Sequence, residues 1–324
     1  SVDEKNIQSG RADIMPVEVI KNAGFCFGVS RAVNMAYEAA KQQNHNTYML
    51  GQIIHNPQVV NQLECLGVKI VTNIEDIPEN SIVIARAHGI TVDEQNLLES
   101  KKIKIIDTTC PFVAKTQQIV KEASKAGETV LIGGDKNHPE VRSIKSYGGS
   151  KIYTFKNNNE LVKLLKNLDL SENPRVSVVW QTTFKIAEFE ICKKNIKKLF
   201  KNPKVYDTIC NATEKRQAQT KELAKKSDVM IILGGKNSSN TNKLFEIAKT
   251  YCNNTFFAES TNEIPIELIY KKSNIGIAAG ASTPDRMIEE VKGIMSEKTN
   301  EATVNNEQEL EVKAEAQAQT ANTK

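Results

Sequence analysis

Short apolar runs rich in β-branched residues recur along the chain and indicate buried strands. Most end at glycine or at small polar residues, which is typical of strands that give way to loops. The runs fall at residues 16–20, 81–85, 103–107, 129–133, 175–180, 229–234 and 275–280. Because almost every position within them is apolar, they predict strands that are covered on both faces, as in parallel sheets.

Longer segments with apolar residues at helical spacing separate these runs. They predict helices at residues 29–43, 57–66, 112–127, 158–168, 185–201, 214–226 and 239–251. Strands that alternate with helices in this way favour an α/β fold with mainly parallel sheets.

One order of motifs occurs three times. Each copy opens with a cysteine at a strand end: F-C-F-G-V-S at Cys26, T-C-P-F-V-A at Cys110 and I-C-N-A-T-E at Cys210. A glycine-containing polar cluster follows 28 or 29 residues later, at His55, His138 and then S-S-N from residue 238. Each copy closes with a third strand end, in A-R-A-H-G, W-Q-T-T and A-A-G-A-S. The repeat predicts three similar α/β units in a trefoil-like, pseudo-threefold arrangement.

The repeat also predicts one central site. Ligands of open α/β sheets bind beyond the carboxyl ends of the strands, where all these motifs lie. We divide the chain into units at 16–106, 107–206 and 207–296. A flexible N-terminal extension, 1–15, would precede them, and a disordered acidic tail or linker, 297–324, would follow.

The bulk composition excludes several classes of protein. The 324 residues are 40% apolar and 25% charged, with a formal net charge of +4, as in an ordinary soluble protein. Lysine pairs are scattered and no basic stripe carries interleaved aromatics, which argues against nucleic acid as a partner. No apolar run approaches the ~18 residues of a membrane helix, and no signal-peptide pattern opens the chain. We therefore expect a cytoplasmic protein without a membrane partner.

The six cysteines include no C-x-x-C pair, and in such a chain they favour metal binding or catalysis over disulfides. Three thiolates brought together by the fold can hold zinc or an iron–sulfur cluster. A closed structural zinc site normally has four protein ligands, and the repeat supplies no fourth. A cubane cluster with three cysteines leaves one iron open to substrate, which favours catalysis over electron carriage. We expect the remaining cysteines, Cys65, Cys192 and Cys252, to be core or surface residues.

Neutral donors occupy the other strand ends of the repeat. Three of the four histidines stand there, and the third unit contributes short hydroxyl and amide side chains. Beside glycines at helix N-termini, such groups suit an anion with phosphate oxygens. No Walker motif or dinucleotide fingerprint is present, so a nucleotide is not implied. The candidates are His55, His88, His138, Ser238, Ser239, Asn240 and Ser282.

Glu140 directly follows His138 and Pro139 in N-H-P-E, and Thr182 adds a hydroxyl in the middle unit. A carboxyl group in such a cavity donates protons if burial raises its pKa. Structural roles remain open for all of these residues. The histidines could be hydrogen-bond partners of the fold, Ser238 a helix N-cap, and Glu140 a favourable charge in a first helical turn.

The motifs together resemble the LytB/IspH family of 4-hydroxy-3-methylbut-2-enyl diphosphate reductases. The resemblance covers about residues 17–294 and rests on A-G-F-C-F-G-V, L-G-Q-I-I-H-N, A-R-A-H-G, D-T-T-C-P, N-H-P-E, Q-T-T, K-N-S-S-N and A-G-A-S-T-P-D, in that order. It implies a trefoil-like fold around one 4Fe–4S cluster that is held by Cys26, Cys110 and Cys210.

The resemblance also implies a reaction. This is the two-electron, two-proton reductive dehydroxylation of (E)-4-hydroxy-3-methylbut-2-enyl diphosphate to isopentenyl and dimethylallyl diphosphates, the last step of the non-mevalonate isoprenoid pathway. Glu140 would donate protons, with His138 and Thr182 near the substrate hydroxyl. The diphosphate would lie among His55, His88, Ser238, Ser239, Asn240 and Ser282. Because the chain has no flavin or nicotinamide fingerprint, a ferredoxin or flavodoxin is implied as the electron donor.

Two other classes of protein fit parts of the pattern. A non-catalytic iron–sulfur or zinc protein, such as a redox sensor, would use the cysteines alone. A phosphosugar enzyme of α/β type would use the histidines directly and would not need the cysteines.

Overall fold

The computed structural model describes residues 17–42, 46–168, 174–266 and 274–297. The expected N-terminal extension and the tail after residue 297 lie outside these ranges, so both stay predictions. Within the described part of the chain, no helix is both long and apolar enough to cross a membrane.

The described strands form three four-stranded sheets in which all neighbouring strands are parallel. The first sheet has the order β3-β2-β4-β5, which comprise Lys69–Val71, Thr47–Leu50, Ile82–Ala85 and Lys104–Asp107. The second has the order β7-β6-β8-β9, which comprise Ile152–Phe155, Thr129–Gly133, Val176–Trp180 and Lys204–Val205. The third has the order β1-β12-β10-β11, which comprise Val17–Val19, Ile275–Ala279, Val229–Leu233 and Thr255–Ala258. The α/β class with parallel sheets is confirmed.

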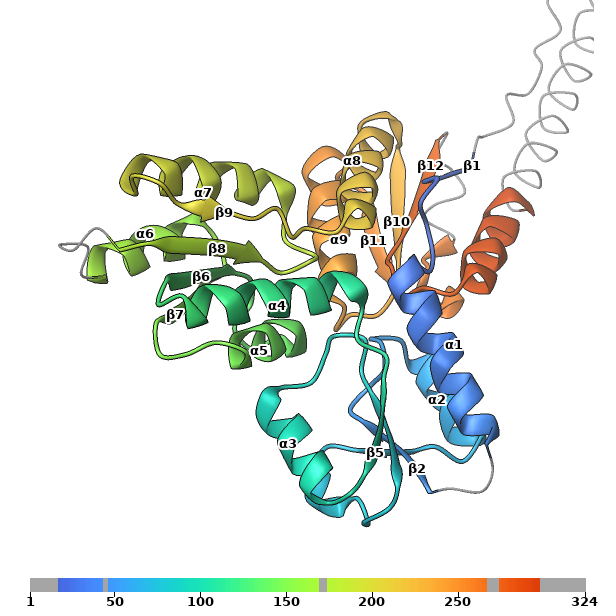
Figure 1. Ribbon diagram of the computed structural model, residues 1–324. Coiled ribbons are helices and arrows are strands. Elements are labelled where there is room, and N and C mark those ends of the chain that lie inside the picture. The colour runs from blue at the N-terminus through green and yellow to red at the C-terminus, as the bar shows by residue number, and fades with distance from the viewer. Residues whose placement is uncertain (1–16, 43–45, 169–173, 267–273, 298–324) are drawn as a thin grey trace, which may run out of the picture.

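Helices make the crossovers that parallel strands require. The first unit contains α1 (Phe27–Lys41), α2 (Pro57–Cys65), η1 (Ile74–Asp76) and α3 (Val92–Ser100). The second contains α4 (Pro111–Lys125), α5 (Pro139–Ser146), α6 (Asn158–Asn167) and α7 (Ile186–Leu199). The third contains α8 (Asn211–Lys226), α9 (Ser239–Tyr251), η2 (Thr261–Glu263) and a helix over residues 285–297. Figure 1 shows the units as three lobes around a common centre.

The N-terminal strand completes the last sheet. In β1, Val17 is paired with Ile275 of β12, and the amide of Ile20 donates to the carbonyl of Ile277 at 3.0 Å. With β1 included, each sheet has an edge strand that leads into one of the repeat cysteines and then into the first helix of the next unit. Our division places β1 in the first unit, whereas its hydrogen bonds lie in the third sheet. The unit boundaries themselves stay a prediction.

Both faces of each sheet are covered by apolar side chains. In β10, Val229, Ile231 and Leu233 pack into one cluster, while Met230 and Ile232 pack into the cluster on the opposite face. The other two sheets likewise contribute to two clusters each. Burial on both faces explains why the strands appear in the sequence as continuous apolar runs.

The strands expected from apolar runs are all present, and so are the expected helices, with ends shifted by a few residues. The apolar pattern did not single out β2, β3, β7, β9 and β11. Of these, β2 is a central strand of four residues, all of which are buried. The other four are short strands at sheet edges. Edge strands bury less surface and so need fewer apolar residues. It also did not single out α3, α5 or the helix over 285–297, the first two of which are only nine and eight residues long.

Replacing Ile20 by alanine should destabilise the protein through the sheet that β1 completes. Ile20 is 5% exposed and packs among apolar residues of the third unit. Loss of a buried isoleucine side chain typically costs roughly 2–5 kcal/mol, so the urea midpoint should fall clearly. Leu66→Ala, at a side chain that is 47% exposed, is the control and should change the unfolding free energy by about 0.5 kcal/mol or less. Equal midpoints for the two variants would contradict this view of β1.

Candidate active site

The three repeat cysteines begin three helices. Cys26, Cys110 and Cys210 are the N-cap residues of α1, α4 and α8, and each has extended backbone torsion angles. Pro111 follows as the first helical residue of α4, where no backbone N–H is needed. An N-cap position places each sulfur beside free backbone N–H groups at the positive end of a helix dipole, which favours a thiolate.

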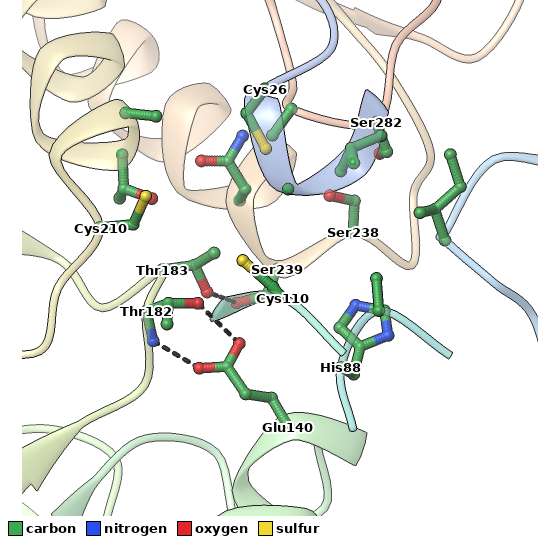
Figure 2. A pocket seen from close by; sticks show the side chains of 18 of the residues that line it. Cys26, His88, Cys110, Glu140, Thr182, Thr183, Cys210, Ser238, Ser239 and Ser282 are labelled. Carbon is green, nitrogen blue, oxygen red and sulfur yellow. Dashed lines mark hydrogen bonds between the residues drawn. The ribbon is translucent and has the colours of Figure 1, made fainter. Parts of the chain in front are cut away.

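The sulfur atoms face one another across a cavity of about 110 Å³, as Figure 2 shows. Burial raises the pKa of the Cys110 thiol to about 11, and repulsion from Cys26 and Cys210 adds to this rise. A metal centre bound by all three sulfurs removes this obstacle to ionisation. The backbone of α1 also comes close, because a Cβ atom at Gly28 would lie 2.5 Å from the sulfur of Cys110.

Arg216 is a second sign that this end of the cavity holds negative charge. Its side chain is only 3% exposed and lines the same cavity as the cysteines. Within the described part of the chain, no carboxylate lies within ion-pair distance of it. A buried cation without an anion is costly, whereas three thiolates around a metal centre supply one. The donor set and the charge therefore fit an iron–sulfur cluster.

Three imidazoles form the adjacent wall. His55, His88 and His138 follow β2, β4 and β6, and their ring centroids lie 4.6, 5.2 and 5.7 Å apart. Burial lowers the pKa of each ring, for His138 to about 3, so all three are neutral near pH 7. Nε2 of His55 and Nδ1 of His88 are buried without a hydrogen-bond partner. These atoms are ready for a polar ligand.

The protonation of His138 favours an anion over a metal ion in this wall. By distance alone the three imidazoles could hold a metal, since their nitrogens lie within 4.8 Å of one another. However, Nδ1 of His138 accepts the amide N–H of Glu140 at 3.2 Å. In the neutral ring Nε2 must then carry the proton, so it acts as a hydrogen-bond donor. A donor suits a phosphate oxygen and not a cation.

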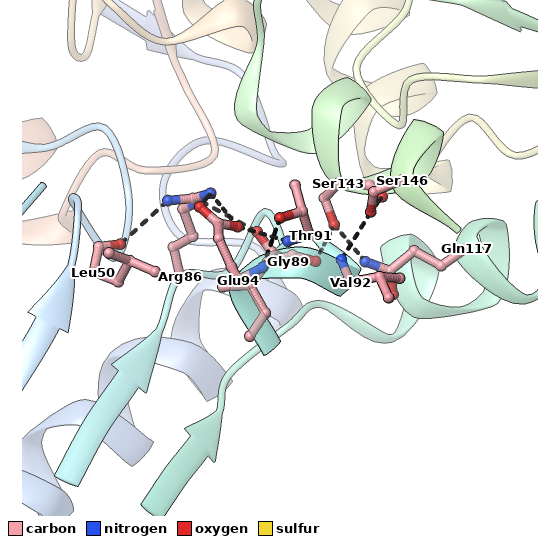
Figure 3. Close-up of polar contacts among 10 residues, drawn as sticks. Leu50, Arg86, Gly89, Thr91, Val92, Glu94, Gln117, Ser143 and Ser146 are labelled. Carbon is pink, nitrogen blue, oxygen red and sulfur yellow. Dashed lines mark hydrogen bonds and ion pairs between the residues drawn. The ribbon is translucent and has the colours of Figure 1, made fainter. Parts of the chain in front are cut away.

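An ion pair holds the loop that carries His88. Arg86 donates to both carboxylate oxygens of Glu94 at 3.0 and 3.1 Å and to the carbonyl oxygens of Gly89 and Leu50. Figure 3 shows these contacts. Because Leu50 ends β2, Arg86 joins the two strand ends that precede His55 and His88.

Helix α5 clamps the other side of the same loop (Figure 3). The hydroxyl of Ser143 donates to the carbonyl oxygen of Ile90 at 2.9 Å, and the amide of Val92 donates to Ser146 at 3.1 Å. Helix α5 begins just after His138 and contains Glu140. These two hydrogen bonds therefore fix the position of the loop that carries His88 relative to Glu140.

The third unit supplies hydroxyl and amide groups. Ser238 is the N-cap of α9, and the amide nitrogen of the Asn240 side chain is buried without a partner. Ser282 donates to the backbone carbonyl of His55 at 3.3 Å. This contact between the first and third units requires glycine at 235, because a Cβ there would lie 2.4 Å from the carbonyl oxygen of His55.

Glu140 lies in the cavity wall beside Thr182 (Figure 2). It is 2% exposed; its carboxyl oxygens accept the Thr182 amide at 2.6 Å and the Thr182 hydroxyl at 2.8 Å. Burial raises its pKa, and the contacts with Thr182 and the charge of Lys243 oppose that rise. Since burial is the larger effect, Glu140 holds its proton to a higher pH than a solvent-exposed glutamate does.

Every site residue expected from the sequence lines this one cavity. Cys192 and Cys252 are buried in apolar clusters and Cys65 is exposed, as expected. Sequence reasoning missed Arg216 and Lys243. The repeat itself held a signal for Arg216, because the positions six residues after Cys26 and Cys110 are Ala32 and Thr116, both fully buried. By the repeat, Arg216 occupies the equivalent position in the third unit, so a buried arginine could have been expected there. We find no such signal for Lys243, whose ammonium donates to Ser239 at 2.9 Å.

Known proteins are similar to this chain in sequence and in fold. The family model for LytB protein matches residues 17–296. A 4-hydroxy-3-methylbut-2-enyl diphosphate reductase from Campylobacter hominis is 42% identical over 278 residues, which are 86% of this chain and 97% of that protein.

Two solved structures have a similar fold. An E-1-hydroxy-2-methyl-but-2-enyl-4-diphosphate reductase from Plasmodium falciparum matches with a TM-score of 0.80 and 27% identity, over 85% of this chain and 86% of that one. An (E)-4-hydroxy-3-methyl-but-2-enyl diphosphate reductase, named as the terminal enzyme of the non-mevalonate pathway, matches with a TM-score of 0.62 and 40% identity, over 87% and 99%. These matches support the trefoil-like arrangement, and the chain belongs to the LytB protein family.

Proposed function

We propose that this protein is an iron–sulfur oxidoreductase that converts (E)-4-hydroxy-3-methylbut-2-enyl diphosphate to isopentenyl and dimethylallyl diphosphates. Its relatives carry the name of that reductase and match nearly the whole described chain. The observation that carries the proposal is the single cavity lined by three N-cap cysteines, three neutral histidines and a buried carboxyl group. A redox sensor that used only the cysteines would not need the other two sets.

The cofactor in this proposal is one 4Fe–4S cluster held by Cys26, Cys110 and Cys210. When bound, the cluster would supply electrons and a Lewis-acidic iron that has no protein ligand. The support is the donor set: three sulfurs at helix N-termini, with the unpaired cation of Arg216 beside them. We place the reaction in the cytoplasm, where free cysteines of this kind stay reduced.

The diphosphate would lie against neutral donors. His138 lines the cavity and carries its proton on Nε2 because its Nδ1 is engaged, and His55 and His88 have unpartnered nitrogens. The N-terminus of α9 adds free backbone N–H groups and the donors of Ser238, Ser239 and Asn240, and Ser282 completes the set. Desolvated donors of this kind fix an anion firmly without a lysine clamp.

The protons would pass through Glu140. Removal of the allylic hydroxyl as water breaks one C–O bond and consumes two electrons and two protons, one for the hydroxyl and one for carbon. Glu140 would hold the proton in the cavity, where two hydrogen bonds from Thr182 fix the orientation of its carboxyl group. Thr182 and His138 would lie near the substrate hydroxyl. The two electrons would come from outside the chain, and we propose a ferredoxin or flavodoxin as their donor.

Protein purified without oxygen should be brown and contain about four irons per chain. Cys110→Ser should lose most of the iron and the visible absorbance, because two sulfurs hold a cluster poorly. Cys65→Ser, at an exposed cysteine outside the cavity, is the matched control and should keep both. A colourless wild-type protein with one zinc ion would exclude the cluster.

Glu140→Gln should keep the cluster and bind the diphosphate but lose turnover by about 10²- to 10⁴-fold. Glutamine retains the shape of the side chain and its contacts with Thr182 but cannot donate an acidic proton. Single-turnover assays and substrate binding measure the two effects separately. Glu64→Gln, at an exposed position, should leave both unchanged. Normal turnover by the Glu140 variant would show that another group donates the proton.

Stability of the substrate-free protein should rise with pH between about 3 and 6.5 through the histidines. The unfolded chain protonates histidine below its ordinary pKa of 6.5, whereas the folded protein keeps His138 neutral down to about 3. The unfolded state therefore binds more protons in this window, and acid favours unfolding. His138→Gln should make the urea midpoint depend less on pH between 7.5 and 5.5. The same slope as wild type would mean that His138 is protonated in the folded state.

A further inference from the structure

Arg216 lies on the buried face of α8, between the cysteine that begins this helix and the loop that leads to Cys26. One terminal nitrogen donates to the carbonyl oxygen of Gly24 at 2.5 Å and the other to that of Ala212 at 3.4 Å. The remaining guanidinium nitrogen, Nε, is buried without a partner. Both partners are neutral, so neither compensates the charge of the guanidinium.

The charged groups that act on Arg216 are cysteines. Burial lowers the pKa of the Arg216 guanidinium, and Cys26 and Cys210 oppose this shift when they are ionised. Among the described residues no Asp or Glu comes within ion-pair distance of it, although eleven ion pairs form elsewhere in this part of the chain. Arginine stays protonated even when it is buried, so this position carries a fixed positive charge.

We propose that Arg216 is the counter-charge of the cluster and that it sets the potential at which the cluster accepts an electron. Three thiolates leave the bound cluster with a net negative charge, and each added electron makes that charge larger. A fixed cation in the same desolvated cavity wall stabilises the reduced state more than the oxidised state. Arg216 therefore acts on the reaction through the electrostatic potential at the cluster and does not touch the substrate.

The inference rests on the proposed iron–sulfur centre, and it adds a specific consequence. Water and dissolved ions strongly screen the electrostatic effect of exposed charges, whereas a charge on a buried side chain is screened much less. Loss of Arg216 should therefore make the cluster harder to reduce. We expect the equilibrium constant for one-electron reduction to fall at least about tenfold, which corresponds to a shift of the midpoint potential by about 59 mV to more negative values.

The test is a redox titration of the cluster-loaded protein, followed by its absorbance and by electron paramagnetic resonance. The variants are Arg216→Gln, which removes the charge, and Arg216→Lys, which keeps it. Lys215→Gln is the matched control, because Lys215 is the neighbouring residue on α8 and is exposed. Iron per chain is measured for each variant, so that cluster loss and a change in potential are separated.

The inference predicts a downward shift for Arg216→Gln, a much smaller shift for Arg216→Lys, and no shift for Lys215→Gln. If Arg216→Gln cannot hold iron, retention of iron by Arg216→Lys supports the role of charge. Loss of iron in both variants overturns the inference and indicates that Arg216 is needed only for its hydrogen bonds within the fold. An unchanged potential in Arg216→Gln also overturns the inference. Absence of iron from the wild-type protein would instead contradict the proposed function, so the two failures are distinguishable.

Discussion

The pairing of β1 with β12 is the constraint on which the site depends. In each sheet an edge strand leads into a repeat cysteine and then into the first helix of the next unit. In the third sheet this edge strand is β1, which lies at the N-terminal end of the described chain, whereas the other three strands lie near its C-terminal end. The hydrogen bonds of β1 tie Cys26 to the third unit, where Cys210 begins α8. Together with the contacts of Ser282 with His55 and of Arg216 with Gly24, this closure holds the first unit against the third, and all three cysteines line one cavity.

Desolvation gives the gathered groups their chemistry. The same burial keeps three histidines neutral, raises the pKa of Glu140 and leaves Arg216 without a carboxylate. Each of these states is costly in isolation and becomes favourable with an occupant of the right charge. In the function proposed above, that occupant is an anionic metal centre around the cysteines and a diphosphate around the histidines and the N-terminus of α9. On that proposal the cavity would hold two anionic groups side by side, with Glu140 in the wall of the same cavity.

Much of this could be predicted from the sequence, since strand ends and helix starts have local signals. The recurrence of a polar cluster 28 or 29 residues after each cysteine was enough to group Cys26, Cys110 and Cys210. The destination of β1 could not be predicted, because a short apolar strand contains no information about which distant sheet it joins. The tautomer of His138 depends on one backbone amide, and the position of Lys243 depends on how α9 packs against the second unit. These are properties of three-dimensional packing and have no sequence period.

The central claim is that the assembled cavity reduces an allylic alcohol in a diphosphate. The most direct measurement supplies protein purified without oxygen with (E)-4-hydroxy-3-methylbut-2-enyl diphosphate and a strong one-electron reductant, and follows the products by chromatography. The account predicts loss of the substrate with formation of both isopentenyl and dimethylallyl diphosphates, and one water per substrate consumed. An iron-loaded, reducible protein that leaves the substrate unchanged would contradict it.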